Sequence, residues 1–230
     1  MKRINFVVIL LFCSFSLFSQ AVKDRSVIPV AVNLNQVLRM TITNGGNIEF
    51  VFNTIDDYKN GLSSEVASAS ANPTTSQSLY QTDFSVSSST RWELTYGTEE
   101  ADFLGTDHPT AKFDINNVGF TITNNGSNTF EGAAALKGAT AGASLWSVPT
   151  KNATEVSALQ TYPIVLITDN GTVNANAGDA VDNSFTLNWR CGTAEAGAVV
   201  PMNDVKLIDQ NPSPVADRYV VNVIFDVASI

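Results

Sequence analysis

The sequence predicts an all-β protein, folded as an antiparallel β-sandwich with long polar loops. Two observations predict this class. Apolar side chains recur at every second position in many runs from Val27 onward, and clusters of Gly, Asn, Asp and Ser separate these runs. No well-capped amphipathic helix of three turns or more is found in the same part of the chain. With 230 residues, 44% hydrophobic and 15% charged, the chain can bury a core, which excludes a disordered tail or a collagen-like fibre.

The clearest alternation runs through residues 218–227, and two more strong runs start at Trp92 and Phe185. Six further strands are expected over residues 28–34, 37–43, 48–53, 83–88, 118–123 and 163–168. The inward-facing set is Trp92, Leu94, Phe185, Leu187, Trp189, Tyr219, Val221, Val223 and Phe225. Residues 63–78 and 129–152 show little alternation, so we expect two long polar loops there.

The first 19 residues have the layout of a secretory signal peptide. Lys2 and Arg3 form a basic start, residues 6–18 are apolar, and small residues follow, with cleavage after Ser19 or Ala21. The apolar run is shorter than a membrane-spanning helix needs. We therefore expect a single β-sandwich domain over residues 20–230, with no transmembrane segment in the mature chain. It should be extracellular or on the cell surface, with the periplasm as the alternative.

Charge and cysteine content narrow the class of partner. Cleavage after Ser19 leaves 11 basic against 22 acidic residues, a net charge of −11. Such a field repels phosphates, so nucleic acid is excluded as a partner. Cys191 is the one cysteine of the mature chain, and no intramolecular disulfide can form. Cys191 is either a small buried residue at a strand end or the site of an intermolecular disulfide.

The sequence carries no catalytic or cofactor signature. The single histidine, His108, lies in Thr106-Asp107-His108-Pro109, which is typical of a turn, and there is no Gly-x-Ser-x-Gly motif to supply a nucleophile. One histidine and one mature cysteine are too few for a zinc site of nitrogen or sulfur ligands. We expect no catalytic residues, no metal and no cofactor.

Acidic clusters are the remaining candidates for chemistry. Glu99, Glu100 and Asp102 directly follow the Trp92 run. A glycosidase needs two carboxylates that face each other across a cleft, and these residues are candidates for such a pair. The simpler interpretation is that they are solvated charges at the end of a strand. Residues 169–171 and 179–183 could ligate Ca²⁺, but neither matches an EF-hand, and both are typical of turns.

Tryptophans are candidate sugar platforms. Trp92 and Trp189 are in step with neighbouring leucines, which favours core positions. Trp146 lies in a loop-like stretch, where it either contacts a glycan or partner, or anchors the loop in the core.

The signal peptide ending Phe18-Ser19-Gln20, the run 84–88 leading to Trp92-Glu93-Leu94, and the closing run 219–223 together resemble secreted bacterial β-sandwich surface proteins. These are the pilin-like, spore-coat-U-like and WxL-like proteins. The resemblance implies an immunoglobulin-like or pilin-like sandwich. The Phe-Ser-Gln ending is similar to Bacteroidetes-type secretion signals, which implies a Gram-negative envelope or exterior. The usual pilin disulfide is missing, since one cysteine cannot form it.

These observations favour a secreted, non-enzymatic structural or adhesive protein of the bacterial surface, such as a filament or pilus-like subunit. A carbohydrate-binding module with exposed aromatics is one alternative, and a secreted hydrolase is another. Residues 28–34, behind the polar leader 20–25, either close their own sheet or pair with an exposed edge of a neighbouring subunit. Partners would then be further copies or other surface subunits, or glycans.

Overall fold

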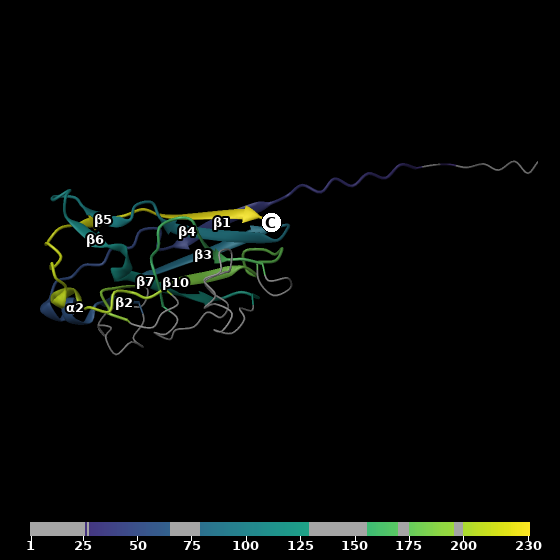
Figure 1. Ribbon diagram of the computed structural model, residues 1–230. Coiled ribbons are helices and arrows are strands. Elements are labelled where there is room, and N and C mark those ends of the chain that lie inside the picture. Colours follow the sequence, from purple (N-terminus) through teal and green to yellow (C-terminus); the bar gives the residue numbers. More distant parts are fainter. Residues whose placement is uncertain (1–25, 27, 65–78, 129–155, 170–174, 196–199) are drawn as a thin grey trace, which may run out of the picture. The chain divides into compact units, whose positions relative to one another are not determined.

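Antiparallel strands form most of the regular structure in the computed structural model. The structure describes residues 26, 28–64, 79–128, 156–169, 175–195 and 200–230. Contacts divide the chain into two units, Met1–Asn35 and Gln36–Ile230. The described residues of the first unit form neither helix nor strand. All the strands belong to the second unit (Figure 1).

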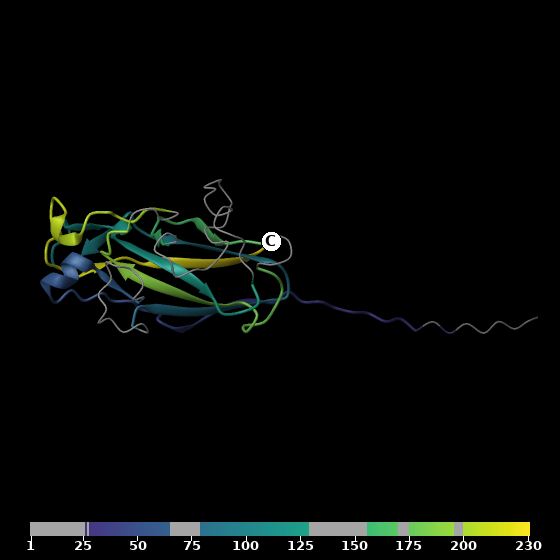
Figure 2. The same ribbon diagram turned by 90° about the horizontal axis from the view of Figure 1, so that it is seen from below.

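The larger sheet has β3 and β10 near its centre. Its strand order is β1 (Leu38–Asn44), β3 (Gln81–Ser88), β10 (Ser184–Cys191), β7 (Val118–Asn124) and β8 (Ser157–Ala158), with β2 (Leu62–Ser63) pairing the end of β10. All these pairings are antiparallel. Phe185 of β10 lies opposite Phe84 on one side and Asn124 on the other, and Figure 2 shows β7 and β10 running side by side.

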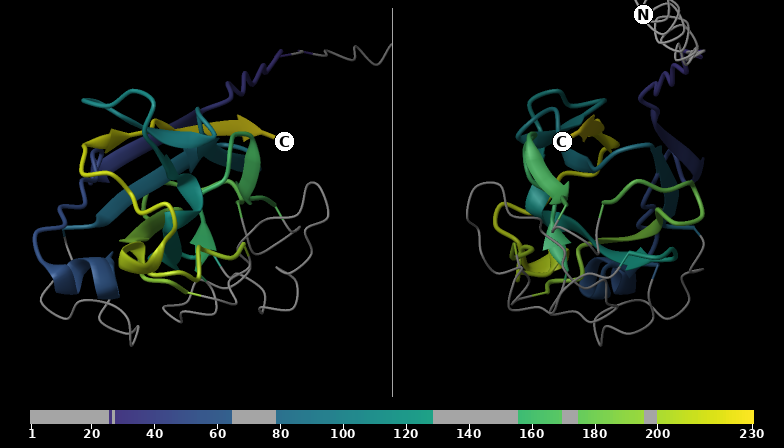
Figure 3. Two further views of the ribbon diagram at one scale, coloured as in Figure 1. Left: turned by 60° about the vertical axis from the view of Figure 1, so that its left-hand side comes forward. Right: turned by 90° about the vertical axis from the view of Figure 1, so that its right-hand side faces the viewer.

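Two three-stranded sheets form the opposing layer. One has the order β12 (Val223–Ser229), β4 (Trp92–Thr98), β9 (Ile164–Ile167), and the other β11 (Tyr219–Val220), β5 (Asp102–Gly105), β6 (Lys112–Asp114). The chain passes from β4 into β5 and from β11 into β12, so the second sheet continues the first. Figure 3 shows this layer facing the larger sheet.

The core lies between the two layers. Trp92 of β4 meets Phe185 of β10 edge to face, with ring centroids 6.1 Å apart. Tyr96 of β4 meets Phe120 of β7 in the same way at 5.2 Å. All four side chains are fully buried. Aromatic pairs of this geometry add to the stabilisation that burial gives. The predicted all-β, antiparallel sandwich-like class is confirmed.

Most of the predicted strands are present. The runs at 37–43, 83–88, 118–123 and 163–168 correspond to β1, β3, β7 and β9. The run at 218–227 is divided, because β11 ends at Val220 and β12 starts at Val223. Its inward residues, among them Tyr219 and Phe225, are only half-buried, since this run lies at the edge of its layer.

Two predicted strands are absent from the sheets of the described chain. Residues 28–34 and 48–53 alternate in sequence as strands do, yet neither forms a ladder with any strand in the described part of the chain. Alternation makes a segment competent to form a strand, but a ladder also needs a free edge beside it. The short strands β2, β5, β6 and β8 were not predicted, because two to four residues are too few for a periodic signal.

A short helix follows residues 48–53. Helix α2 (Ile55–Asn60) begins at a capping box: Thr54 Oγ1 accepts the Asp57 N–H at 3.2 Å, and Asp57 Oδ2 accepts the Thr54 N–H at 2.8 Å. It packs beside the 3-10 turn η4 (Leu207–Asp209), at the left of Figure 2. Within the described ranges, no helix has both the length and the apolar character needed to cross a bilayer.

Candidate functional site: a cavity in the seam of the sandwich

The two layers meet along one side at strands β1 and β12. Each pairs with only one other strand of the described chain, β1 with β3 and β12 with β4. The two strands also contact each other across the layers. Their inward side chains are half-buried, in contrast with the fully buried residues of the central strands: Leu38, Met40, Val223, Phe225 and Val227. We call this side of the sandwich the seam.

Where β1 ends and β12 begins, the seam opens into a cavity of about 420 Å³. One wall is residues 47–52, which follow β1, and the other is residues 214–221, which include β11. We call this space the seam cavity. Its floor comes from both layers and from α2 and η4: Tyr58, Phe103, Phe113, Val118, Cys191 and Leu207. The volume lies in the range of small-molecule and peptide side-chain pockets.

Residues 47–52 form the first wall because of their alternation. Ile48, Phe50 and Phe52 are half-buried and pack on the core, while Glu49 and Val51 are exposed. This wall therefore has the side-chain arrangement of a strand. It pairs with no strand of the described part of the chain.

The interior of the cavity is aromatic. Phe52 lies 5.3 Å from Tyr58 between ring centroids, and Phe113 lies 5.7 Å from Phe103 and 5.5 Å from Tyr219. The Tyr219 hydroxyl donates to the Val215 carbonyl at 2.8 Å, and burial raises the pKa of this phenol. Such a lining favours an apolar occupant over a polar one.

An ion pair joins the two walls at the surface. Arg218 Nε lies 3.1 Å from Glu49 Oε1, and the side chains are 62% and 53% exposed. Exposed pairs of this kind contribute little to stability and weaken further in salt. The contact therefore presents little resistance to an occupant that has to part it.

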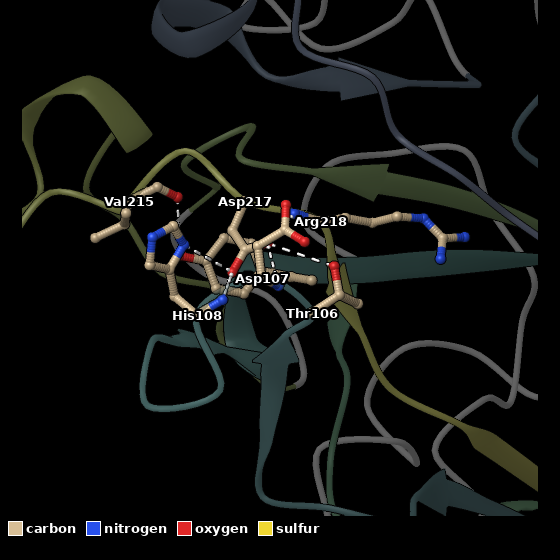
Figure 4. A network of polar contacts seen from close by, with 7 residues as sticks. Thr106, Asp107, His108, Val215, Asp217 and Arg218 are labelled. Atoms are coloured by element: carbon tan, nitrogen blue, oxygen red, sulfur yellow. Dashed lines mark hydrogen bonds and ion pairs between the residues drawn. The ribbon is translucent and has the colours of Figure 1, made fainter.

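Asp217 is held in place by its neighbours (Figure 4). Its carboxylate accepts the N–H groups of Asp107 at 3.0 Å, His108 at 2.9 Å and Arg218 at 2.7 Å, and the Thr106 hydroxyl at 3.4 Å. Burial alone would raise the pKa of Asp217. The three backbone donors and the nearby His108 outweigh burial and lower this pKa to about 2.

Gly105 of β5 makes this arrangement possible. A Cβ at that position would lie 2.3 Å from Asp217 Oδ2 and 2.6 Å from the His108 carbonyl oxygen. The absence of a side chain lets the turn close over the carboxylate. Asp217 thus ties the β5–β6 turn to the second wall of the cavity.

His108 lies in a turn, as its sequence context predicts. Its carbonyl accepts the Ala111 N–H at 2.8 Å, and its Nδ1 lies 3.4 Å from Asp217 Oδ2. The imidazole is 60% exposed. Its partners at this turn in the described part of the chain are Asp217 and the backbone of Ala111, and no serine or cysteine is among them.

The acidic clusters are engaged in pairing or turn formation. Asp102 pairs with Lys112 across β5 and β6 at 2.7 Å, and Glu99 accepts the Asn222 side-chain amide at 2.8 Å. Asp169 pairs with Arg91 at 3.1 Å, and Asp179 Oδ1 accepts the Val181 N–H at 2.7 Å. In the ranges that the structure describes, no three His, Cys, Asp or Glu residues are grouped in a way that could hold a metal ion.

Trp92 and Trp189 are core residues, as predicted. They are 0% and 5% exposed, and their indole N–H groups donate to Asn176 O at 3.1 Å and Thr82 Oγ1 at 2.9 Å. Neither can serve as an exposed sugar platform. Trp146, the predicted contact residue, lies outside the described residues.

Cys191 ends β10 and is buried, as the sequence interpretation favoured. Burial raises the pKa of its thiol. A buried thiol with a raised pKa reacts slowly, which disfavours an intermolecular disulfide at this position. Sequence reasoning did not place Cys191 beside a cavity.

No protein-family model matches the chain. No curated protein matches it either. The seam cavity itself was not predicted: its walls carry alternating apolar residues that the sequence pattern assigned to two ordinary strands.

Proposed function

We propose that this chain is a secreted, non-enzymatic structural or adhesive protein of the bacterial cell surface, whose subunits associate by strand addition into a filament or pilus-like polymer. The secretion signal proposed for residues 1–19 and the acidic sandwich support this role. One observation carries it: Ile28, Val30, Val32 and Leu34 alternate along a segment that pairs with no strand of the described residues, and they are 82%, 84%, 76% and 91% exposed.

Such exposure is costly for a protein in water. Burying one of these side chains fully is worth about 1.5–3 kcal/mol. A contiguous apolar run that is left exposed marks an interaction site. Since the apolar residues fall on one face of an extended chain, the matching interaction is pairing with the free edge of a sheet.

Self-association of the secreted chain tests this function. We expect the purified mature protein to form oligomers at micromolar concentration in sedimentation velocity, and filaments by electron microscopy. The double variant Val30→Ser/Val32→Ser should sediment as a monomer, because it removes apolar surface from the pairing face. Ala31→Ser/Asn33→Ser, which changes the other face of the same segment, is the matched control and should still assemble.

If the wild-type protein is a monomer, the proposed polymer is excluded and only the role of a monomeric adhesin is left. Location is tested separately, by labelling intact cells with an antibody against the folded chain. Labelling only after the cells are opened would contradict a surface role.

A further inference from the structure

The seam cavity has the features of an acceptor for an extended apolar segment. Both walls carry alternating side chains, and β11 pairs only with β5 among the described strands, so its other edge is free. The interior is aromatic and aliphatic, and the polar groups at the rim are already paired with each other. An occupant with alternating apolar side chains and no charge would match this surface.

We propose that the seam cavity receives residues 28–34 of a second copy of this chain, which add as a strand beside β11. This inference rests on the proposed function and names the acceptor within it. Residues 28–34 are the exposed segment described above.

The segment fits the cavity in length. Seven residues in an extended conformation span about 20 Å. In the wall of residues 214–221 only Tyr219 and Val220 form a strand, whereas the wall of residues 47–52 keeps the alternation of a strand over six residues, a comparable length. Four alternating side chains of the segment can then point toward the floor: Ile28, Val30, Val32 and Leu34. Pro29 lacks an N–H group, which a strand tolerates near its first residue.

The segment also fits in charge. Residues 26–35 contain no Lys, Arg, Asp or Glu. At the cavity, Arg218 and Glu49 balance each other, and Asp217 is satisfied by backbone donors. A neutral apolar strand would therefore leave no unpaired charge facing apolar surface.

The length of the chain between residue 34 and the cavity favours the segment of a second copy, and not the chain's own segment, as the occupant of the cavity. Leu34 precedes Leu38 by four residues, which span at most about 14 Å. Strand β1 itself advances about 20 Å from Leu38 to Asn44, and the cavity wall starts only at residue 47. Because four residues cannot span that distance, residues 28–34 of the same chain cannot all lie along the cavity, whereas a neighbouring chain has no such limit.

Engineered cysteines test the pairing. Every variant carries Cys191→Ala, so that only added thiols react, and thermal unfolding confirms that this background is folded. One full-length mature variant has Val32→Cys. A second, differently tagged, has Val51→Cys or Val220→Cys, one on each wall. After mild oxidation of the mixture, we expect a heterodimer, enriched roughly tenfold or more over a non-docked pair because docked thiols share a high effective concentration.

Val181→Cys is the matched acceptor control, since Val181 is 76% exposed but does not line the cavity. A synthetic peptide of residues 26–35 should suppress the heterodimer, and the same peptide with serine at positions 30 and 32 should not.

Three outcomes separate the possibilities. If the chains assemble but Val32→Cys cross-links equally well to Val181→Cys, this acceptor is wrong and the proposed function stands. If a single chain carrying both Val32→Cys and Val51→Cys cross-links within itself at high dilution, the occupant is the chain's own segment and the inference is overturned. If the wild-type chain stays monomeric and no heterodimer forms, both proposals fail together.

Discussion

Arg190 of β10 and Glu195, which follows this strand, form a buried ion pair. Arg190 Nη1 lies 2.7 Å from Glu195 Oε1 and 2.9 Å from Oε2, and the two side chains are 1% and 4% exposed. Removing one partner takes a close opposite charge away from a charge that stays buried, which is costly. We expect Glu195→Ala to lower the free energy of unfolding by about 3–5 kcal/mol in chemical denaturation.

The double variant Arg190→Met/Glu195→Leu supplies the contrast. Because it removes both charges and keeps apolar volume, it should cost less than Glu195→Ala alone. A double variant as unstable as the single one would mean that the pair is worth more than its desolvation costs.

Replacing Trp189 tests the core. Its indole packs on Phe120 at 5.2 Å between ring centroids and donates to Thr82. We expect Trp189→Ala to reduce the free energy of unfolding by about 3–5 kcal/mol, since the change leaves a cavity. Val181→Ala, at an exposed turn, should leave the unfolding midpoint nearly unchanged. An unshifted midpoint in Trp189→Ala would place the indole outside the core.

We expect the ionisation of Asp217 to make the stability of the fold depend on pH in the acid range. Its pKa is about 2 in the folded chain, below the usual value of about 3.9 for an unfolded chain. The ionised carboxylate therefore stabilises the fold above pH about 4, and this contribution is lost as the pH falls toward 2. Asp217→Asn should melt at a lower temperature than wild type at pH 7, and the difference should shrink across the acid range.

Asp204→Asn, at an exposed carboxylate, is the matched control for this pH series. We expect this variant to have the same melting temperature as the wild type at every pH. A constant gap between wild type and Asp217→Asn from pH 7 to pH 2 would mean that the carboxylate's charge plays no part.

His108 should not support hydrolysis. The backbone of this residue, rather than its exposed imidazole, makes the hydrogen bonds of the turn. We expect a broad screen of ester, peptide and glycoside substrates to find no turnover that His108→Ala abolishes. Activity that is lost in a folded His108→Ala protein would defeat the non-enzymatic proposal.

Periodicity predicted much of the fold. Phe185, Leu187 and Trp189 alternate with less apolar neighbours because one face of β10 meets the opposing layer. The alternation in the sequence therefore predicts which side chains of this strand are buried. The same logic located β4, since Trp92, Leu94 and Tyr96 all face the core.

The seam cavity could not be predicted in this way. Residues 28–34 and 48–52 carry the strand pattern, but the pattern does not say whether an edge is available to either. Glu49 and Arg218, which meet at the rim, are 169 residues apart in the chain. Their proximity depends on how the two layers pack together, and the local sequence around each residue does not reveal that packing.

The positions of the exposed segment and the cavity along the chain have one more consequence. The segment precedes the first residue of β1, and the cavity begins beyond the last. If one chain's segment fills the next chain's cavity, the contact is heterologous, and its repetition gives an open, directional polymer when the rotation between neighbours does not close a ring. Its two ends differ: one presents an empty cavity and the other an unused segment. A Val30→Ser/Val32→Ser chain would then occupy only the end that still offers a segment and would stop growth there, so a small fraction of it should shorten every filament in the mixture.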